Sequence, residues 1–109
     1  MKNSTQLHER RISTTLANLG CTAIESKSSG LIALRMGTDE QLYPISVEVY
    51  EDESADAADP HRFRARVSRQ FGLPVVYHHG MTIDAALASV RWRLLDRPPI
   101  SVAPTMAFA

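Results

Sequence analysis

Residues 45–50 read Ile-Ser-Val-Glu-Val-Tyr, and this short run decides the fold that we expect. Three β-branched residues alternate with Ser46, Glu48 and Tyr50. Because successive side chains of a strand point to opposite faces, the run predicts a strand over residues 43–51 with one face in the core. The other face carries an acid, which is either a solvated surface group or part of a metal site.

The bulk composition is that of one globular domain. The chain has 109 residues, 44% of them hydrophobic and 22% charged. Its formal net charge is zero, so any site for nucleic acid has to be a local patch. The single cysteine, Cys21, excludes a disulfide within the chain, and we expect its thiol to be buried.

The sequence gives no sign of a membrane partner. No apolar run approaches the ~18 residues of a membrane span. The segment 1–11 is polar and lacks the apolar region of a signal peptide. We therefore expect a cytoplasmic protein, bacterial or phage in style.

The first part of the chain predicts a helix and two strands before the 43–51 strand. Ser4 or Thr5 can cap a helix that Gly20 ends in a left-handed conformation. The strands are expected at residues 21–27 and 31–36, with turns at 28–30 and 37–39.

A second helix is expected after the acidic loop at residues 51–60. Asp59 can act as its N-cap and Pro60 as its first residue. Apolar residues then recur at i, i+4 and i+8: Phe63, Val67 and Phe71. This spacing predicts a helix over residues 60–71, which Gly72 ends.

The remaining elements complete an α/β fold. We expect a strand at 73–78, a helix at 83–95 capped by Thr82, and a proline-containing tail at 97–109. The order α-β-β-β-α-β-α predicts one domain over residues 1–96, a central mixed sheet flanked by helices, with a right-handed strand–helix–strand crossover.

Four stretches of this sequence resemble the metal-dependent nucleases of the PD-(D/E)xK superfamily, which have the restriction-endonuclease-like fold. In style they are nearest to archaeal-type Holliday junction resolvases. The stretches are HERRISTTLANLGC (8–21), SSGLIALRMG (28–37), LYPISVEVYED (42–52) and RFRARVSRQFGLPVVYHH (62–79). The resemblance implies the nuclease fold and a metal site at the centre of the sheet.

The resemblance carries over to only part of the nuclease site. Glu9 matches the helical acid and Glu48 the acid of the third strand. The metal-binding aspartate falls at Gly30, and the lysine two residues after the strand acid falls at Tyr50. Mg²⁺ usually needs more than one acidic ligand, and a tyrosine brings no positive charge at neutral pH. We therefore expect a catalytically degenerate, nuclease-like binding module without a cofactor.

An active nuclease with displaced ligands is one alternative. Glu25 and Lys27 share one face of the neighbouring strand because they are two residues apart. If that face also carries Glu48, these side chains can form a Mg²⁺ site. An ordinary exposed ion pair is the competing interpretation.

The expected binding surface is a row of arginines on the second helix. Arg62, Arg66 and Arg69 recur at i, i+4 and i+7, with Arg64 nearby. Such a row can follow the phosphates of a nucleic acid, and Arg10 and Arg11 can widen the patch. A solvated face that pairs with the acidic loop would have the same spacing.

A protein partner or a homodimer is the other alternative. Trp92 lies opposite Ile83 on the last expected helix, and its side is also apolar: Ala85, Ala88 and Leu95. A partner or the tail, through Ile100 and Val102, can cover this side. His78 and His79 end a strand and point to opposite faces, so they do not readily share a metal.

Overall fold

Three consecutive strands form the centre of one sheet: β3 (Leu31–Met36), β4 (Leu42–Glu51) and β5 (Phe63–Arg69). The computed structural model describes residues 1–69 and 72–97, with the backbone alone at 72–74. Within these residues, β2 (Cys21–Ser26) and β6 (Gly72–Gly80) lie at the two edges, in the order β2-β3-β4-β5-β6. The short β1 (Lys2–Asn3) pairs with the end of β4, and the pairings between these strands are antiparallel.

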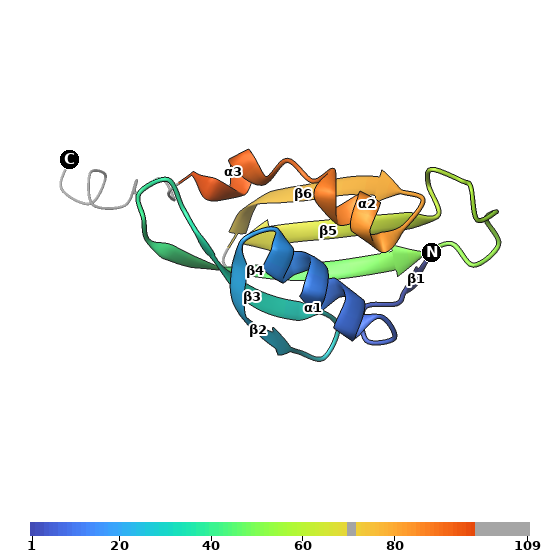
Figure 1. The fold of residues 1–109 in the computed structure, drawn as a ribbon, viewed down its shortest axis with the longest axis horizontal. Coiled ribbons are helices and arrows are strands. Elements are labelled where there is room, and N and C mark those ends of the chain that lie inside the picture. The colour runs from blue at the N-terminus through green and yellow to red at the C-terminus, as the bar shows by residue number, and fades with distance from the viewer. Residues whose placement is uncertain (70–71, 98–109) are drawn as a thin grey trace.

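The helices gather on one face of this sheet. They are α1 (Glu9–Asn18), α2 (Ile83–Ala88) and α3 (Trp92–Asp96). Figure 1 shows α1 in front of β3 and β4, and α2 in front of β5 and β6. The described chain therefore has two layers, a sheet and a layer of helices.

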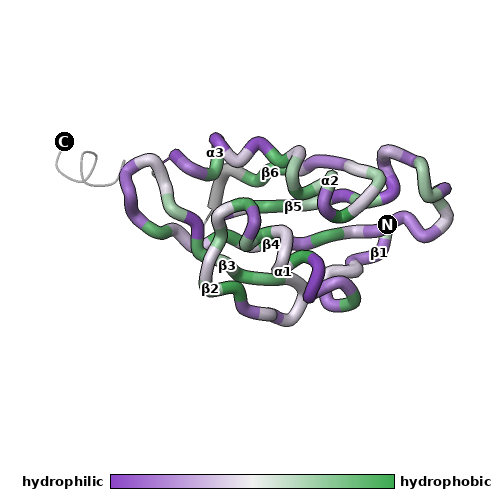
Figure 2. The backbone as a smooth tube through the Cα atoms, in the orientation of Figure 1, coloured by the Kyte–Doolittle hydropathy of each residue, from purple (hydrophilic) through white to green (hydrophobic). Residues whose placement is uncertain are grey.

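The core lies between these layers because the strands alternate in polarity. On β4, Ile45, Val47 and Val49 are fully buried, and on β5 so are Ala65 and Val67. Helical residues close the core from the other side: Ile12 and Leu16 of α1, and Ile83, Ala86 and Leu87 of α2. Full burial of a Val, Leu or Ile side chain contributes about 1.5–3 kcal/mol, so this single layer of contacts supplies most of the driving force. Figure 2 shows the hydrophobic stretches running along the central strands.

Several predictions from the sequence are confirmed. The α/β class, with helices packed on a sheet, is correct, and the strand expected at 43–51 is β4. Gly20 has a φ of 94°, the left-handed conformation expected after the first helix. Cys21 is 3% exposed, and burial raises the pKa of its thiol.

The helix predicted for residues 60–71 is wrong, because residues 63–69 form β5. A spacing of i, i+4 and i+8 fits one face of a helix, but these even offsets also fit one face of a strand. Ala65, which a helix would expose, fills the position between Phe63 and Val67 on the buried face. The expected strand–helix–strand crossover is therefore replaced by an antiparallel hairpin of β4 and β5.

Two other helix boundaries also differ from the prediction. The first helix begins at Glu9 rather than after Ser4 or Thr5, because the buried hydroxyl of Thr5 contacts the backbone of Val49 on β4. The last helix is divided into α2 and α3. The capping role of Thr82 is confirmed, since its Oγ1 accepts a hydrogen bond from the amide of Ala85 at 3.0 Å.

Candidate functional site

The face of the sheet opposite the helices carries a set of polar and aromatic side chains. Strand register places them together, because paired residues of antiparallel strands point to the same side. This surface, which we call the open face, consists of Ile32 and Leu34 on β3, Ser46, Glu48 and Tyr50 on β4, Arg64, Arg66 and Ser68 on β5, and Val75, Tyr77 and His79 on β6. The described helices pack on the other side of the sheet.

An arginine lies between two tyrosine rings on the open face. The guanidinium of Arg64 is 5.1 Å from the ring centroid of Tyr50 and 5.2 Å from that of Tyr77. Both distances are within the range of cation–π attraction. The Nε of Arg64 is buried and has no hydrogen-bond partner among the described residues. This group keeps unused hydrogen-bonding capacity beside two aromatic rings.

A second arginine connects these rings to the acid of β4. Nη1 of Arg66 donates to Oε1 of Glu48 at 2.9 Å, and its Nε donates to the hydroxyl of Tyr77 at 3.3 Å. The Tyr77 hydrogen bond and the charge of Glu48 raise the pKa of Arg66 above its ordinary value. Burial, followed by the charge of Glu48, raises the pKa of Tyr50, which keeps its ring neutral. We call Tyr50, Arg64, Arg66 and Tyr77 the arginine–tyrosine cluster.

A groove of about 450 Å³ lies on the same face beside this cluster. Its polar lining includes Lys27, Ser46, Glu48, Arg66 and Ser68, and Ile32 and Val75 supply apolar surface. A pocket of this size, with a few convergent polar groups, is typical of small-molecule subsites. The open face therefore has both a flat aromatic part and a hollowed polar part.

Gly30 sets the shape of this groove. A Cβ added at this position would lie 2.5 Å from the carbonyl oxygen of Val47 and 2.9 Å from Cγ of Glu48. The absence of a side chain thus allows the turn after β2 to approach β4 closely. Position 30, where the nuclease resemblance places a metal-binding aspartate, has no room for one.

The remaining nuclease positions do not come together. Glu9 is on α1, over the covered face of the sheet, whereas Glu48 is on the open face. The carboxylate of Glu48 already pairs with Arg66. Among the residues that the structure describes, no group of three or more His, Cys, Asp or Glu side chains is placed to hold a metal ion.

The displaced set lies on one side of the sheet, which is the condition that the sequence left open for this alternative. Glu25 pairs with Ile32 across the strands and so points to the open face, and Lys27 lines the groove with Glu48. Glu25 and Lys27 form an exposed ion pair at 3.6 Å, with their side chains 70% and 57% exposed. This is the ordinary ion pair that the sequence left as the competing interpretation.

The arginine row predicted on a helix is dispersed, because its residues belong to a strand. Arg62 precedes β5 and bonds Glu51 at 3.0 Å, and Arg69 points to the helix side and donates to the carbonyl of Leu95 at 3.1 Å. Of the three, only Arg66 is on the open face, where Arg64 joins it. Arg10 and Arg11 belong to α1 on the opposite side of the molecule and do not widen this patch.

The surface predicted around Trp92 is also not formed as expected. Leu95 is 2% exposed and belongs to the core, and the Trp92 ring packs against the same core. Nε1 of Trp92 donates to the carbonyl of Leu87 at 3.0 Å, and the guanidinium of Arg35 lies 4.6 Å from its ring centroid. Ala85 and Ala88 are on α2, which is a separate helix. Cover by Ile100 and Val102 lies outside the described residues.

The two strand histidines point to opposite faces, as predicted. His79 is on the open face, where its ring meets that of His61 edge to face at a centroid distance of 4.7 Å. Its Nδ1 is buried and has no partner within the described chain. Burial, then the neighbouring His61, Arg64 and His78, lower the pKa of His79.

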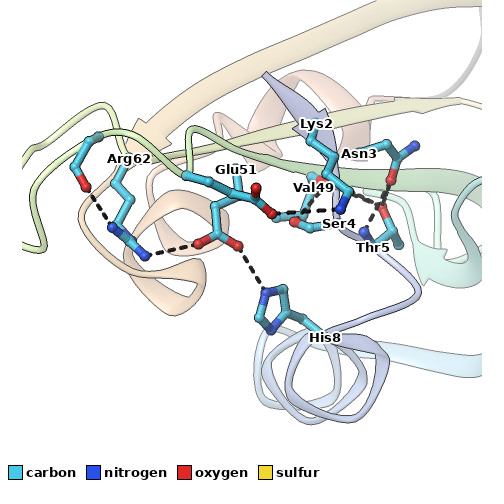
Figure 3. A network of polar contacts seen from close by, with 10 residues as sticks. Lys2, Asn3, Ser4, Thr5, His8, Val49, Glu51 and Arg62 are labelled. Atoms are coloured by element: carbon cyan, nitrogen blue, oxygen red, sulfur yellow. Dashed lines mark hydrogen bonds and ion pairs between the residues drawn. The ribbon is translucent and has the colours of Figure 1, made fainter.

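A buried polar network fixes the base of the acidic loop (Figure 3). Glu51 is 9% exposed and accepts from Arg62, while its other oxygen contacts Nε2 of His8 at 3.2 Å. Arg62 also donates to the carbonyl of Ala55 at 2.7 Å. The network joins α1, β4 and the loop that leads into β5. Pairing of the arginines with the acidic loop was one interpretation of the sequence, but the burial of Glu51 and its contact with His8 were missed, because Glu51 belongs to the acidic run 51–60 and looks like a solvated residue.

The sequence also did not predict that Arg64 and Tyr77 belong to one cluster. The alternation of residues 63–68 is the signal that assigns Arg64 to one face with Arg66, but it is visible only when the stretch is read as a strand.

No family model, curated protein or solved structure matches this chain. The resemblance to PD-(D/E)xK nucleases stays a prediction from the sequence. None of the helices in the described part of the chain combines the length and apolar character needed to cross a lipid bilayer.

Proposed function

We propose that this domain binds single-stranded nucleic acid on the open face of its sheet. The observation that carries the proposal is the position of Arg64 between the rings of Tyr50 and Tyr77, on the face that the described helices leave uncovered. The domain acts as a binding module rather than as a nuclease. Glu48 is already paired with Arg66, and position 30 has no space for an acid, which supports binding over hydrolysis.

The chemistry of the cluster suits an unpaired strand. Tyrosine rings offer a surface on which unstacked bases can stack, and guanidinium groups both stack on bases and contact phosphates. A duplex hides the faces of its bases, so these rings would have nothing to stack on. Tyr77 is 50% exposed and is therefore accessible to a base.

The charges of the open face predict a moderate affinity. Arg66 is neutralised in part by Glu48, and Lys27 pairs with Glu25. Arg64 contacts two tyrosine rings and makes no salt bridge with the described residues. Stacking therefore contributes more than phosphate contacts. Each contacted phosphate of a single strand adds about −0.7 to the slope of log affinity against log salt concentration. A strand that contacts few phosphates should therefore bind with a shallow dependence on salt.

Binding of a short labelled strand by fluorescence anisotropy tests the proposal, with both DNA and RNA strands. Tyr77→Ala should weaken binding about tenfold, since loss of one stacked base costs about 1–3 kcal/mol. Arg64→Ala should weaken binding and reduce the salt slope by about 0.7.

Arg10→Ala is the matched control, because Arg10 is exposed on α1, on the opposite side of the molecule. It should bind like the unchanged protein. Equal binding by the Tyr77, Arg64 and Arg10 variants would contradict the proposal, as would the absence of binding to either strand at low salt.

A further inference from the structure

We infer that the groove beside the arginine–tyrosine cluster holds one base of the bound strand and selects guanine through the carboxylate of Glu48. This inference rests on the proposed function and names the chemistry that the same face prefers. The starting observation is that Glu48 is an acid on a surface where Lys27, Arg64 and Arg66 would attract an anion.

The groove has the size and lining for a single flat ring. Its volume of about 450 Å³ lies at the lower end of the range for small-ligand pockets, roughly 300–1,000 Å³. Ile32 and Val75 supply apolar surface for the face of a ring. The polar and charged residues of its lining are Lys27, Ser29, Ser46, Glu48, Arg66, Ser68 and Arg69. The groove adjoins Tyr77 through Arg66, so a strand stacked on the cluster can reach it.

Glu48 has free acceptor capacity. Its side chain is 17% exposed, and its Oε1 accepts from Arg66. The other oxygen, Oε2, has a longer contact of 3.4 Å with Nδ2 of Asn3. An ionised carboxylate offers about four lone-pair sites, so it can accept further hydrogen bonds from a ligand. Gly30 contributes by leaving the space that the Glu48 side chain occupies.

The sign of this charge limits what can enter. An ionised carboxylate is an acceptor only, so a group that contacts Glu48 directly has to donate hydrogen bonds. Guanine presents two adjacent donors on one edge, the N1–H and the exocyclic N2 amine, which match the two oxygens of a carboxylate. Adenine and cytosine present one exocyclic amine, and thymine or uracil presents a single imide N–H.

Lys27 completes the match with guanine. The O6 atom of guanine is an acceptor next to N1–H, and it can accept from the ammonium of Lys27, which lines the same groove as Glu48. A carboxylate for the two donors and a cation for the acceptor distinguish guanine from the other bases. Bidentate pairs of this kind discriminate by about 1–3 kcal/mol, which corresponds to roughly 5- to 150-fold in affinity.

Replacement of one atom group in the ligand tests the inference directly. Three labelled strands are compared by fluorescence anisotropy: a thymidine tract, the same tract with one guanosine, and the same tract with one inosine, which lacks the 2-amino group. The unchanged protein should bind the guanosine strand about tenfold more tightly than the inosine strand. In Glu48→Gln this difference should disappear.

Glu25→Gln is the matched control. It removes the same charge from the same face, but Glu25 pairs with Lys27 at the exposed edge rather than lining the groove. It should raise affinity for all strands slightly and keep the guanosine preference. Circular dichroism of both variants checks that the fold is unchanged.

The outcomes separate this inference from the proposed function. Equal affinity for the three strands would overturn the guanine site. A preference for the guanosine strand that persists in Glu48→Gln would overturn it as well. Both results would leave the proposed function standing. If none of the strands binds, the proposed function itself fails.

Discussion

Gly30 lines the groove on the open face, and its part in the packing of the sheet cannot be inferred from its position in the sequence. Gly30 follows two serines in a turn, where a glycine is usually explained by backbone freedom. Here a Cβ atom would lie 2.5 Å from the carbonyl oxygen of Val47. The lack of a side chain therefore matters more at this position than the freedom of the backbone. The groove and the orientation of Glu48 both depend on this close approach.

We predict that Gly30→Asp destabilises the domain and does not restore a metal site. The new Cβ would lie 2.5 Å from a backbone oxygen, and overpacking of this kind costs about 1–3 kcal/mol. Urea unfolding measures the loss, and unfolding repeated with Mg²⁺ reports metal binding. Ser29→Asp, at the exposed neighbouring position, is the control and should be nearly neutral. Equal stability of the two variants would show that the turn can move away from β4.

At the scale of elements, β5 determines which arginines of residues 62–69 lie together. As a helix, residues 60–71 would present Arg62, Arg66 and Arg69 together on one side. As a strand between β4 and β6, the segment divides its arginines between two faces and pairs Arg64 and Arg66 with aromatic neighbours. The type of secondary structure thus selects which cations can act together.

Ala65→Glu distinguishes the two structures of this segment. In a helix Ala65 would lie on the solvent side, about 200° from Phe63, and a glutamate would be tolerated. In β5 it is 0% exposed, and an unpaired buried charge costs about 3 kcal/mol or more. We therefore expect a largely unfolded or strongly destabilised protein by circular dichroism and urea unfolding. Ala88→Glu, at an exposed position of α2, should fold normally, and a stable Ala65 variant would contradict the strand.

At the scale of the whole molecule, basic side chains gather around His79 at the end of the open face nearest the acidic loop. Near the acidic loop, His79 lies against His61 and Arg64, with His78 next along the strand. Burial of the His79 ring disfavours its charged form, and a proton would also add a positive charge beside His61 and Arg64, which face the ring from the loop and from β5. The folded state therefore binds a proton at His79 less readily than the unfolded chain does.

This arrangement predicts a loss of stability as the pH falls. The pKa of His79 is lowered by folding from its usual value of about 6.5, so its contribution is fully present above that pH and is lost below it as the unfolded chain takes up the proton. Urea unfolding between about pH 7.5 and pH 5.5 should show this decline, in a window above the titration of most carboxylates. His79→Gln should flatten the curve, whereas His8→Gln, on the other side of the sheet, serves as the comparison. An identical slope for His79→Gln and the unchanged protein would refute the role of His79.

Features that depend on near neighbours can be predicted from the amino-acid sequence of this chain. The alternation of residues 45–50 predicts β4, Gly20 ends the first helix, and Thr82 caps α2, because each rests on contacts within a few residues. The burial of Cys21 also follows from its apolar surroundings. The α/β class follows from these elements together.

The tertiary structure alone decided the rest. Apolar residues at offsets of four and eight satisfy the period of a helix and that of a strand, and only pairing with β4 makes residues 63–69 a strand. That pairing then places Arg64 between two tyrosines, Arg66 on Glu48, and Glu9 on the other side of the sheet from Glu48. Local periodicity fixes which residues share a face within an element, but the partner strand fixes which elements share that face.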